Sequence, residues 1–226
     1  MTFKYNNVYI KDTATVVGPY EEKGPLKDYF DKSYKDLYFR EKSFEKAEVK
    51  LIKDSISILL NKVDLGSNQI DLVIGGDLLN QICASTYGSL NIGNSYLGVY
   101  DACATSVEEL IIASSLIDSK KISNCLCVTS SHNLSSEKQF RNPVEYGAPK
   151  PHSATFTSTG GASILLTDEK STIKVESSTI GKLIDYDQKD PNNMGAAMAP
   201  AAVDTIKTHF EDSGRTPDYY DLIITG

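Results

Sequence analysis

The sequence predicts a layered α/β protein, with a mainly parallel, mixed sheet flanked by helices. Two observations support this class. Short apolar runs suited to strands alternate with longer segments of helical period. In addition, residues 221–226 (Asp-Leu-Ile-Ile-Thr-Gly) mirror residues 71–76 (Asp-Leu-Val-Ile-Gly-Gly) at an offset of 221 − 71 = 150, and an amphipathic segment precedes each. The alternative is that the chain contains no true repeat of two similar halves, because any two helix–strand units look alike.

The first elements follow from local pattern. Residues 18–43 are charged and rich in tyrosine, and we expect an ordered loop there. Apolar side chains then recur at helical spacing, which predicts a helix over residues 44–63 that ends before Gly66. Residues 71–76 and 96–100 are short apolar runs, typical of strands buried on both faces.

The central elements continue this alternation. We expect a helix over residues 105–119 and a third buried strand over 124–130. Residues 161–166 and 173–180 are expected to form a closing antiparallel pair.

The last elements belong to the second copy of the repeat. Residues 194–210 form an amphipathic pattern with apolar side chains four positions apart, and Gly214 and Pro217 end it. The copy stops where the first one continues, so we expect the chain to end inside its second half. The predicted domains are a first half over residues 1–190 and the start of an incomplete second half over 191–226.

Composition limits the function. The formal net charge of −7 argues against a broad nucleic-acid surface, which needs clustered lysine and arginine. The first residues resemble no signal peptide, and the longest apolar stretch, residues 110–117, is too short to span a bilayer. Four cysteines in a chain of 226 residues form no disulfide framework, so we expect a reducing compartment and no secretion.

Cys103 is the first candidate functional residue. It lies between a predicted strand and a predicted helix, and the spacing of Thr105 with Glu108 fits a capping box, as does that of Ser106 with Glu109. A helix N-terminus stabilises a thiolate, and several enzymes present a nucleophile on such a turn. The alternative is a small cysteine that packs the helix against the sheet.

The turn at residues 101–106 resembles the cysteine turn of the thiolase superfamily, and further phrases resemble one of its branches, the stage V sporulation protein AD family. The likeness covers nearly the whole chain. The phrases that carry it are residues 24–26, 30–34, 76–81, 129–133, 139–141, 145–147 and 193–202. This resemblance implies a thiolase-like fold of two pseudo-symmetric halves.

The resemblance also implies a function. Members of the family bind dipicolinic acid, with or without calcium, and support its uptake into the developing spore. It implies no other cofactor, and partners among the proteins of the spore VA channel. The implied location is the cytoplasmic side of the forespore, with membrane contact only through those partners, and thiolase folds commonly form homodimers.

Acyl transfer in this superfamily needs a set of basic partners for the cysteine. The second half of the fold supplies much of that set. The histidines of this chain are His132, His152 and His209, and none follows a recognisable second-half strand. We therefore expect a protein without catalysis. A condensing enzyme of acyl thioesters that uses Cys103 is the first alternative, and a structural component of the sporulation channel is the second.

Candidate ligand residues follow from the chemistry of a flat dianion, which needs donors or cations and an apolar wall. Side chains after the carboxyl ends of parallel strands are expected to converge. The candidates are Cys103, Asn80, Ser131, His132, Arg141, Tyr146 and Lys150, with Asp77 and Glu145 as weak calcium ligands.

Each candidate has an alternative role. Arg141 and Glu145 are four residues apart and can pair with each other. Asn80 and Asp77 can cap the following helix. His132 can hydrogen-bond within the core, and a lysine such as Lys150 is usually a solvated surface charge. Cys125 and Cys127, without a second cysteine pair, indicate packing rather than a metal site.

Overall fold

The computed structural model describes residues 1–140, 157–190 and 193–225, except for the side chains of residues 137–140. It divides into two compact units. The larger unit is Asn7–Val175, and the smaller combines Met1–Asn6 with Glu176–Gly226. The boundary predicted between residues 190 and 191 separates the halves of the repeat, and it stays a prediction.

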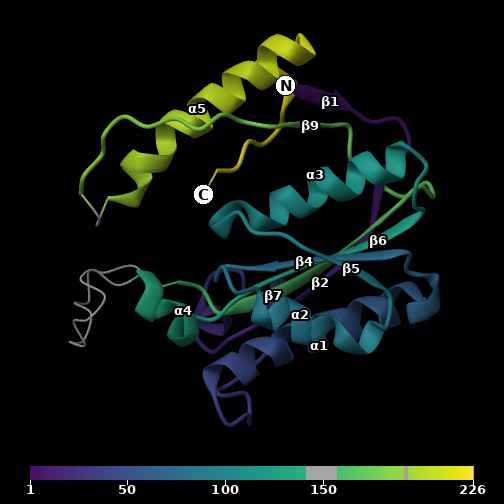
Figure 1. The fold of residues 1–226 in the computed structure, drawn as a ribbon, viewed down its shortest axis with the longest axis vertical. Helices are drawn as coiled ribbons and strands as arrows, with labels where there is room; N and C mark the ends of the chain where they lie inside the picture. The colour runs from purple at the N-terminus through teal and green to yellow at the C-terminus, as the bar shows by residue number, and fades with distance from the viewer. Residues whose placement is uncertain (141–156, 191–192, 226) are drawn as a thin grey trace. The chain divides into compact units, whose positions relative to one another are not determined.

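A seven-stranded mixed sheet forms the centre of the larger unit (Figure 1). Its path is β3-β2-β7-β6-β4-β5, and β8 also pairs with β2. Strands β5, β4 and β6 are parallel, whereas β7 is antiparallel to both β6 and β2. The strands are β2 (Tyr9–Val17), β3 (Lys32–Ser33), β4 (Leu72–Asp77), β5 (Ser95–Gly98), β6 (Asn124–Ser131), β7 (Gly160–Thr167) and β8 (Ile173–Lys174).

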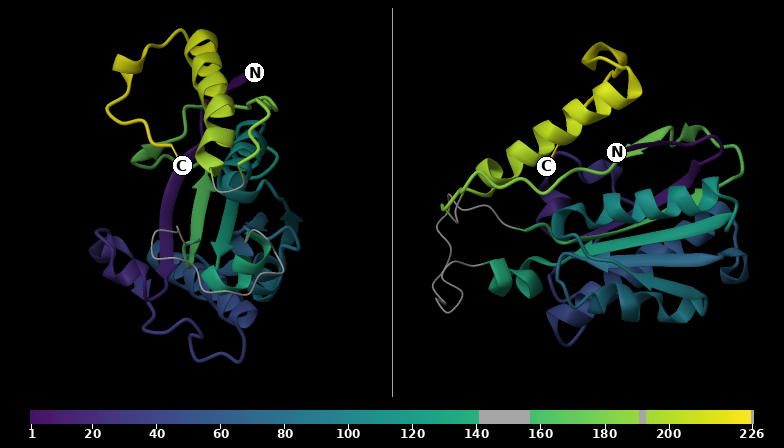
Figure 2. Two further views of the ribbon diagram at one scale, coloured as in Figure 1. Left: turned by 90° about the vertical axis from the view of Figure 1, so that its left-hand side faces the viewer. Right: turned by 45° about the horizontal axis from the view of Figure 1, so that its top comes forward.

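Helices cover both faces of this sheet, with α1 and α2 on one face and α3 on the other (Figure 2). The predicted layered α/β class is confirmed. The helices of this unit are α1 (Phe44–Val63), α2 (Cys83–Ser89), α3 (Thr105–Asp118) and α4 (Asn133–Phe140).

Helix α1 carries much of the core. Ser43 caps its first turn by accepting a hydrogen bond from the Lys46 N–H, and Asp64 closes it in the left-handed conformation. Its apolar face packs on the strands at ordinary helical spacing. The buried cluster contains Ile52, Ile56 and Leu59 of α1 together with Ala14, Val73, Leu126, Val128 and Leu165 of four strands.

Two strand predictions were wrong. Residues 161–166 do not pair with residues 173–180, because β2 is the antiparallel partner of both β7 and β8. The sequence pattern missed β2, in which charged residues interrupt the apolar ones and the register shifts between Ile10 and Asp12. Strand β5 was predicted to be buried on both faces, but it lies at the edge of the sheet and is largely exposed.

The segment over residues 18–43 is the ordered loop that its sequence predicts. It contains two short 3₁₀ turns, η1 (Glu21–Lys23) and η2 (Lys27–Tyr29), in addition to β3. Phe39 anchors it by complete burial beside Leu51 of α1.

The smaller unit contains β1 (Thr2–Lys4) paired antiparallel with β9 (Ser177–Thr179), followed by α5 (Met194–Ser213) and the 3₁₀ turn η6 (Pro217–Tyr219). Asn193 caps α5 by accepting a hydrogen bond from the Ala196 N–H, and Gly214 ends it with a φ of +69°.

The internal repeat holds for these elements. Helix α5 begins 194 − 44 = 150 residues after α1 begins, and it ends 213 − 63 = 150 residues after α1 ends. The turns η3 (Ser67–Gln69) and η6 are separated by the same offset. Residues 221–225 break the correspondence, because they form no strand, whereas β4 is paired on both sides. Within the described residues, segment 221–225 has no such strand partner.

Candidate functional site

The turn that carries Cys103 is fixed by its own hydrogen bonds. It forms a short 3₁₀ turn, η5 (Ala102–Ala104), directly before α3. The Thr105 hydroxyl accepts from the Asp101 N–H at 3.0 Å and donates to the Ala102 carbonyl at 2.8 Å. Ala102 has a φ of +44°, a conformation that costs energy for a residue other than glycine and is common at functional sites. The Cys103 side chain is exposed.

This arrangement corrects the predicted capping box. Helix α3 does begin at Thr105, but no side chain caps it, and its N-cap residue is Ala104. The Thr105 hydroxyl instead braces the turn that precedes the helix. The sequence pattern therefore located the helix start correctly and assigned the wrong bonds to it.

Gly76 of β4 allows the start of α3 to approach the sheet. A Cβ atom at this position would lie 2.3 Å from Thr105 Cγ2 and 2.6 Å from the Val99 carbonyl oxygen. Such distances are far inside van der Waals contact, so a side chain here would displace the turn. The glycine therefore helps to set the position of Cys103.

Cys103 lines a cavity of about 420 Å³ at the carboxyl ends of the parallel strands. Hydroxyl groups and small residues dominate its wall, and Phe30 and Leu78 supply larger apolar surfaces. We call this cavity the Cys103 pocket. Its lining residues are Thr15, Val17, Phe30, Leu78, Ala102, Cys103, Ser106, Thr129, Ser130, Ser131, Thr157, Ser158 and Gly160, Gly161, Ala162 of β7.

Three hydroxyl groups of this wall already take part in hydrogen bonds within the protein. Thr129 donates to Oε2 of Glu109 at 2.9 Å, and Ser131 donates to the Ser158 carbonyl at 2.6 Å. Ser130 lies within hydrogen-bond distance of two buried carboxyl groups, described next. By contrast, among the described residues no partner satisfies the hydroxyl of Ser106, three positions after Cys103.

Three buried carboxyl groups lie behind this wall. Glu48, Asp77 and Glu109 are 3%, 2% and 1% exposed, and none of them forms an ion pair with a described residue. Burial raises all three pKa values, that of Glu48 to about 7 and that of Glu109 to about 9. The prediction missed Glu48 and Glu109. The available signal was a carboxyl group on the apolar face of a predicted helix, with Glu48 between Ala47 and Leu51.

His132 does not contact the Cys103 pocket. It is completely buried, its Nδ1 accepts from the Leu134 N–H at 3.2 Å, and its Nε2 donates to the Leu37 carbonyl at 2.8 Å. The rings of Phe39 and Phe44 pack beside it, and burial lowers its pKa. These contacts agree with the alternative role in the core and do not support a direct ligand contact.

Asp77 is held as a structural anion. Its carboxylate accepts hydrogen bonds from the N–H groups of Ala84 and Ser85 at the start of α2, at 2.8 and 2.9 Å. Asn80 is exposed and is not part of the pocket wall. Within the described residues, no cluster of three or more histidine, cysteine or acidic side chains is arranged to hold a metal ion.

Four other candidates lie outside the described residues: Arg141, Glu145, Tyr146 and Lys150. Thr157 and Ser158, the next described residues, line the Cys103 pocket. Cys125 and Cys127, for which the sequence indicated packing, are buried in β6, and this burial agrees with that role.

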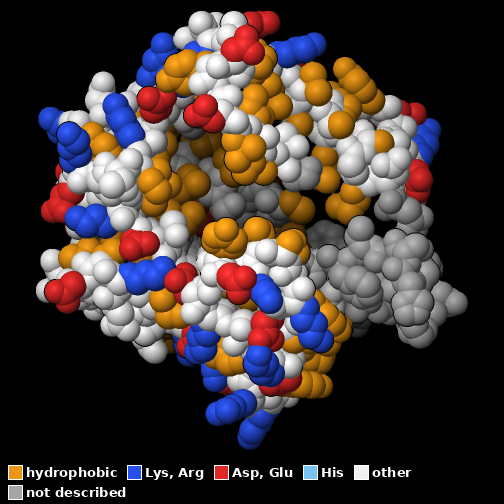
Figure 3. Space-filling model, turned by 180° about the vertical axis from the view of Figure 1, so that it is seen from behind, with side chains coloured by type: hydrophobic (Ala, Val, Ile, Leu, Met, Phe, Trp, Pro, Cys, Tyr) orange, Lys and Arg blue, Asp and Glu red, His pale blue; other side chains and the backbone are white. Residues whose placement is uncertain are grey.

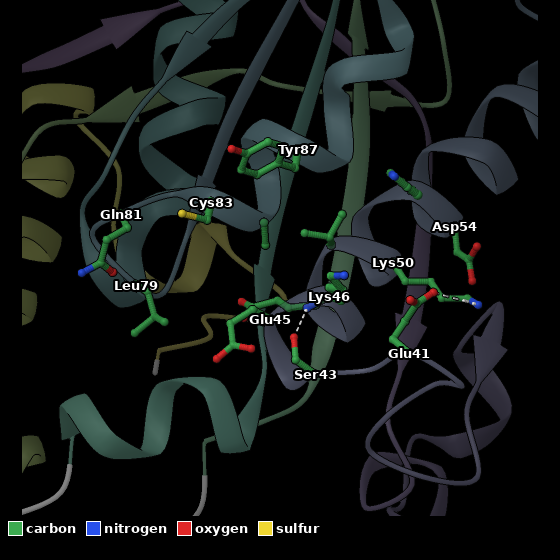
Figure 4. A pocket seen from close by; sticks show the side chains of 14 residues that line it. Glu41, Ser43, Glu45, Lys46, Lys50, Asp54, Leu79, Gln81, Cys83 and Tyr87 are labelled. Atoms are coloured by element: carbon green, nitrogen blue, oxygen red, sulfur yellow. Dashed lines mark hydrogen bonds and ion pairs between the residues drawn. The ribbon is translucent and has the colours of Figure 1, made fainter.

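A larger cavity of about 960 Å³ lies on the opposite face of the sheet, between α1 and α2 (Figure 4). Lys46 and Lys50 of α1 and Cys83 and Tyr87 of α2 contribute to its walls. Glu48, which is 3% exposed, is also one of its lining residues. We call it the α1–α2 pocket.

Surface charge is mixed. Acidic and basic side chains are interspersed on the face of the molecule shown in Figure 3. The expectation of no broad nucleic-acid surface stays a prediction. Among the described helices, none combines the length and the hydrophobicity that a membrane crossing requires.

Solved structures with a similar fold include OleA variants and a 3-oxoacyl-(acyl carrier protein) synthase. An OleA variant of Xanthomonas campestris bound with cerulenin has a TM-score of 0.67 and 13% sequence identity, with 97% of this chain and 75% of that chain covered. The 3-oxoacyl-(acyl carrier protein) synthase III of Xanthomonas oryzae has a TM-score of 0.62 and 12% identity, with 97% and 77% covered. Together with the cysteine turn, this likeness defines a thiolase-fold protein.

Sequence comparison is more specific. The stage V sporulation protein AD of Bacillus subtilis (strain 168) is 43% identical over 219 residues, which are 97% of this chain and 65% of that protein. The family of stage V sporulation protein AD matches residues 1–226. The chain belongs to the stage V sporulation protein AD family, and it spans 65% of the length of this relative.

Proposed function

We propose that this sporulation protein binds dipicolinic acid in the Cys103 pocket, with or without calcium, and supports its uptake into the developing spore without catalysis. The observation that supports this proposal is the pocket at the carboxyl ends of the parallel strands, with hydroxyl groups beside an aromatic wall. Its volume of about 420 Å³ suits a small planar ligand.

The ligand chemistry matches the wall in two respects. Dipicolinate is a flat ring with a carboxylate on each side of a pyridine nitrogen, so it needs an apolar surface and hydrogen-bond donors. Phe30 and Leu78 provide the surface, and the Ser106 hydroxyl, which has no partner among the described residues, can donate. Arg141 and Lys150 remain predicted as the cations that engage the carboxylates, with Tyr146 beside them.

Calorimetry tests the proposal. We expect dipicolinate to bind, and isophthalate, the same dicarboxylate without the ring nitrogen, to bind more weakly. Ser106→Ala should weaken binding by roughly tenfold or more, because a hydrogen bond to a charged carboxylate contributes about 1.5–3 kcal/mol, while Ser119→Ala at the other end of α3 should not. No heat from dipicolinate with or without calcium would reject the proposed ligand.

The assembly is also a proposal. By its membership in a spore protein family, we propose a location at the cytoplasmic side of the forespore, peripheral to the inner spore membrane, with partners in the spore VA channel. We further propose a homodimer. Cross-linking in sporulating cells, followed by identification of the captured proteins, tests both points, and capture of no channel component would reject the first. A protein that is captured but does not bind dipicolinate would support the structural role instead.

Acyl transfer is the second candidate, because Cys103 is exposed at the pocket and similar folds belong to acyl-chain enzymes. Incubation with labelled acyl-CoA should then leave label on Cys103 that Cys103→Ser removes. Cys83 is the matched control, since it is the other exposed cysteine in the described chain. Label on neither cysteine, or equal label on both, would reject specific acyl transfer.

A further inference from the structure

Ser130 bridges two buried carboxyl groups. Its hydroxyl oxygen lies 3.2 Å from Oε1 of Glu48 and 3.2 Å from Oδ1 of Asp77. All three side chains are buried. The bridge joins α1 to the carboxyl ends of β4 and β6, and we call it the Glu48–Ser130–Asp77 bridge.

The number of hydrogen atoms in this bridge is too small for two carboxylates. A serine hydroxyl carries one hydrogen atom, so it donates to one carboxyl group and presents a lone pair to the other. Two ionised carboxylates around one hydroxyl would leave a lone pair facing a buried negative oxygen, without water to separate them. Ionisation of both carboxyl groups is therefore unfavourable, and a proton on one of them, donated to Ser130, relieves the conflict.

The surroundings assign this proton to Glu48. The carboxylate of Asp77 is stabilised by two backbone N–H groups at the start of α2. Among the described residues, the hydrogen-bond partners of the Glu48 carboxyl group are the hydroxyl groups of Ser130 and Ser135, the latter at 2.5 Å. Burial and the negative charge of Asp77 raise the pKa of Glu48 to about 7, which agrees with this assignment.

The other titratable groups near Glu48 do not neutralise it. Glu45 on the same helix adds negative charge, and its pKa is lowered by its hydrogen bonds near the helix start. His132 after β6 is buried with both ring nitrogens bonded, and burial lowers its pKa. Cys83 of α2 and Lys46 of α1 line the α1–α2 pocket with Glu48, and no ion pair to Glu48 exists among the described residues. From α4, as far as its side chains are described, Ser135 faces Glu48.

The bridge lies directly behind the Cys103 pocket. Ser130 lines that pocket, and so does Leu78, the residue that follows Asp77. An anion in the pocket would be separated from Asp77 and Glu48 by Ser130, which lines the pocket and bonds to both. Inside a protein the effective dielectric constant is lower than in water, so like charges repel each other more strongly there than they do in water.

We propose that binding of a dicarboxylate in the Cys103 pocket is coupled to the uptake of one proton from solvent by Glu48, shared through Ser130 with Asp77. This inference rests on the proposed function and concerns how the same site is regulated. The proton removes the second negative charge behind the pocket wall, so the ligand binds the protonated form more tightly. Acidification then favours loading, and alkalinisation favours release.

Calorimetry of dipicolinate in buffers of different ionisation enthalpy measures the proton directly. At pH 7 we expect uptake of roughly half a proton, since Glu48 is about half ionised in the free protein. Between pH 6 and pH 8 the affinity should fall by roughly tenfold, a typical coupling. Glu48→Gln, which imitates the protonated form, should take up no proton and keep its affinity over this range.

The matched control is Glu211→Gln, which makes the same change on the exposed side of α5, outside the bridge, and should leave proton uptake as in the wild type. The ligand-free protein gives an independent readout, because the Glu48 carboxyl carbon in labelled protein should titrate near pH 7 by NMR.

The outcomes separate the two proposals. Binding without proton uptake, uptake that persists in Glu48→Gln, or titration of Glu48 near its ordinary value would each overturn the coupling while leaving the proposed function intact. Absence of dipicolinate binding at both pH 6 and pH 8 would overturn the proposed function and the coupling with it.

Discussion

Glu109 shows how a single buried carboxyl group affects the whole chain. Its Oε2 accepts from Thr129, but its Oε1 has no hydrogen-bond partner among the described residues. Burial raises the pKa of Glu109 to about 9, with the negative charge of Asp77 as a further cause. At neutral pH this group is therefore protonated in the folded protein and ionised in the unfolded chain.

The free energy of unfolding should consequently fall as pH rises from about 4.5 to about 9. Across this window the folded state holds a proton that the unfolded chain has released, so alkali favours unfolding, by at most about 1.4 kcal/mol per pH unit for one group. Glu109→Gln should flatten the slope between pH 7 and pH 9 in urea denaturation, whereas Glu211→Gln on the exposed side of α5 should not. Parallel curves for Glu109→Gln and the wild type would contradict this assignment.

At the scale of elements, close approach between helix and strand depends on glycine. We expect Gly76→Ala to destabilise the larger unit by roughly 1–3 kcal/mol, because the new Cβ would collide with Thr105 and with the backbone of Val99. Gly160→Ala in the neighbouring strand β7 is the control, since its Cβ would meet Val16 and Val17 at an ordinary 3.6 Å. Urea denaturation compares the two, and equal stability would show that the start of α3 moves without cost.

The sequence predicted the elements whose period is regular. The helices over residues 44–63 and 105–119 and the strand over 124–130 agree with α1, α3 and β6 within a residue. It failed for β2, whose charged residues and shifted register hide the alternation, and for β5, whose apolar letters resemble those of a buried strand. Burial at a sheet edge depends on which strand comes next, and local pattern does not contain that information.

For the candidate site, the strand-to-helix turn was sufficient to locate Cys103 beside a pocket. The sequence also placed Ser131 there, but it could not separate His132, the next residue, which turns into the core. Strand β6 ends at Ser131, and the chain turns into α4 at His132, so these adjacent residues have different surroundings. Glu48 and Glu109 were missed because their importance comes from burial, which depends on tertiary packing.

At the scale of the whole chain, the smaller unit exposes an apolar segment. Leu222 and Ile224 are 72% and 81% exposed, and they lie in a stretch of backbone that pairs with no strand in the described residues. We expect this chain to self-associate at micromolar concentration, because such segments are ready partners for other chains. Light scattering should show that Leu222→Lys with Ile224→Lys reduces association.

The control for this prediction is Leu183→Lys, which changes a fully exposed leucine of the same unit away from that segment. An equal reduction by both changes would point to a general effect of net charge. If the unmodified chain does not self-associate, the exposed apolar side chains of residues 221–225 do not drive association.

The pairing of β1 with β9 has a consequence for synthesis. Thr2 pairs with Thr179, so the first strand of the chain finds its partner only after 177 further residues have been made. At typical rates of translation this interval lasts about 9 to 35 seconds. By then every strand of the larger unit has been synthesised, since that unit ends at Val175. Strand β1 therefore leaves the ribosome well before the strand with which it pairs.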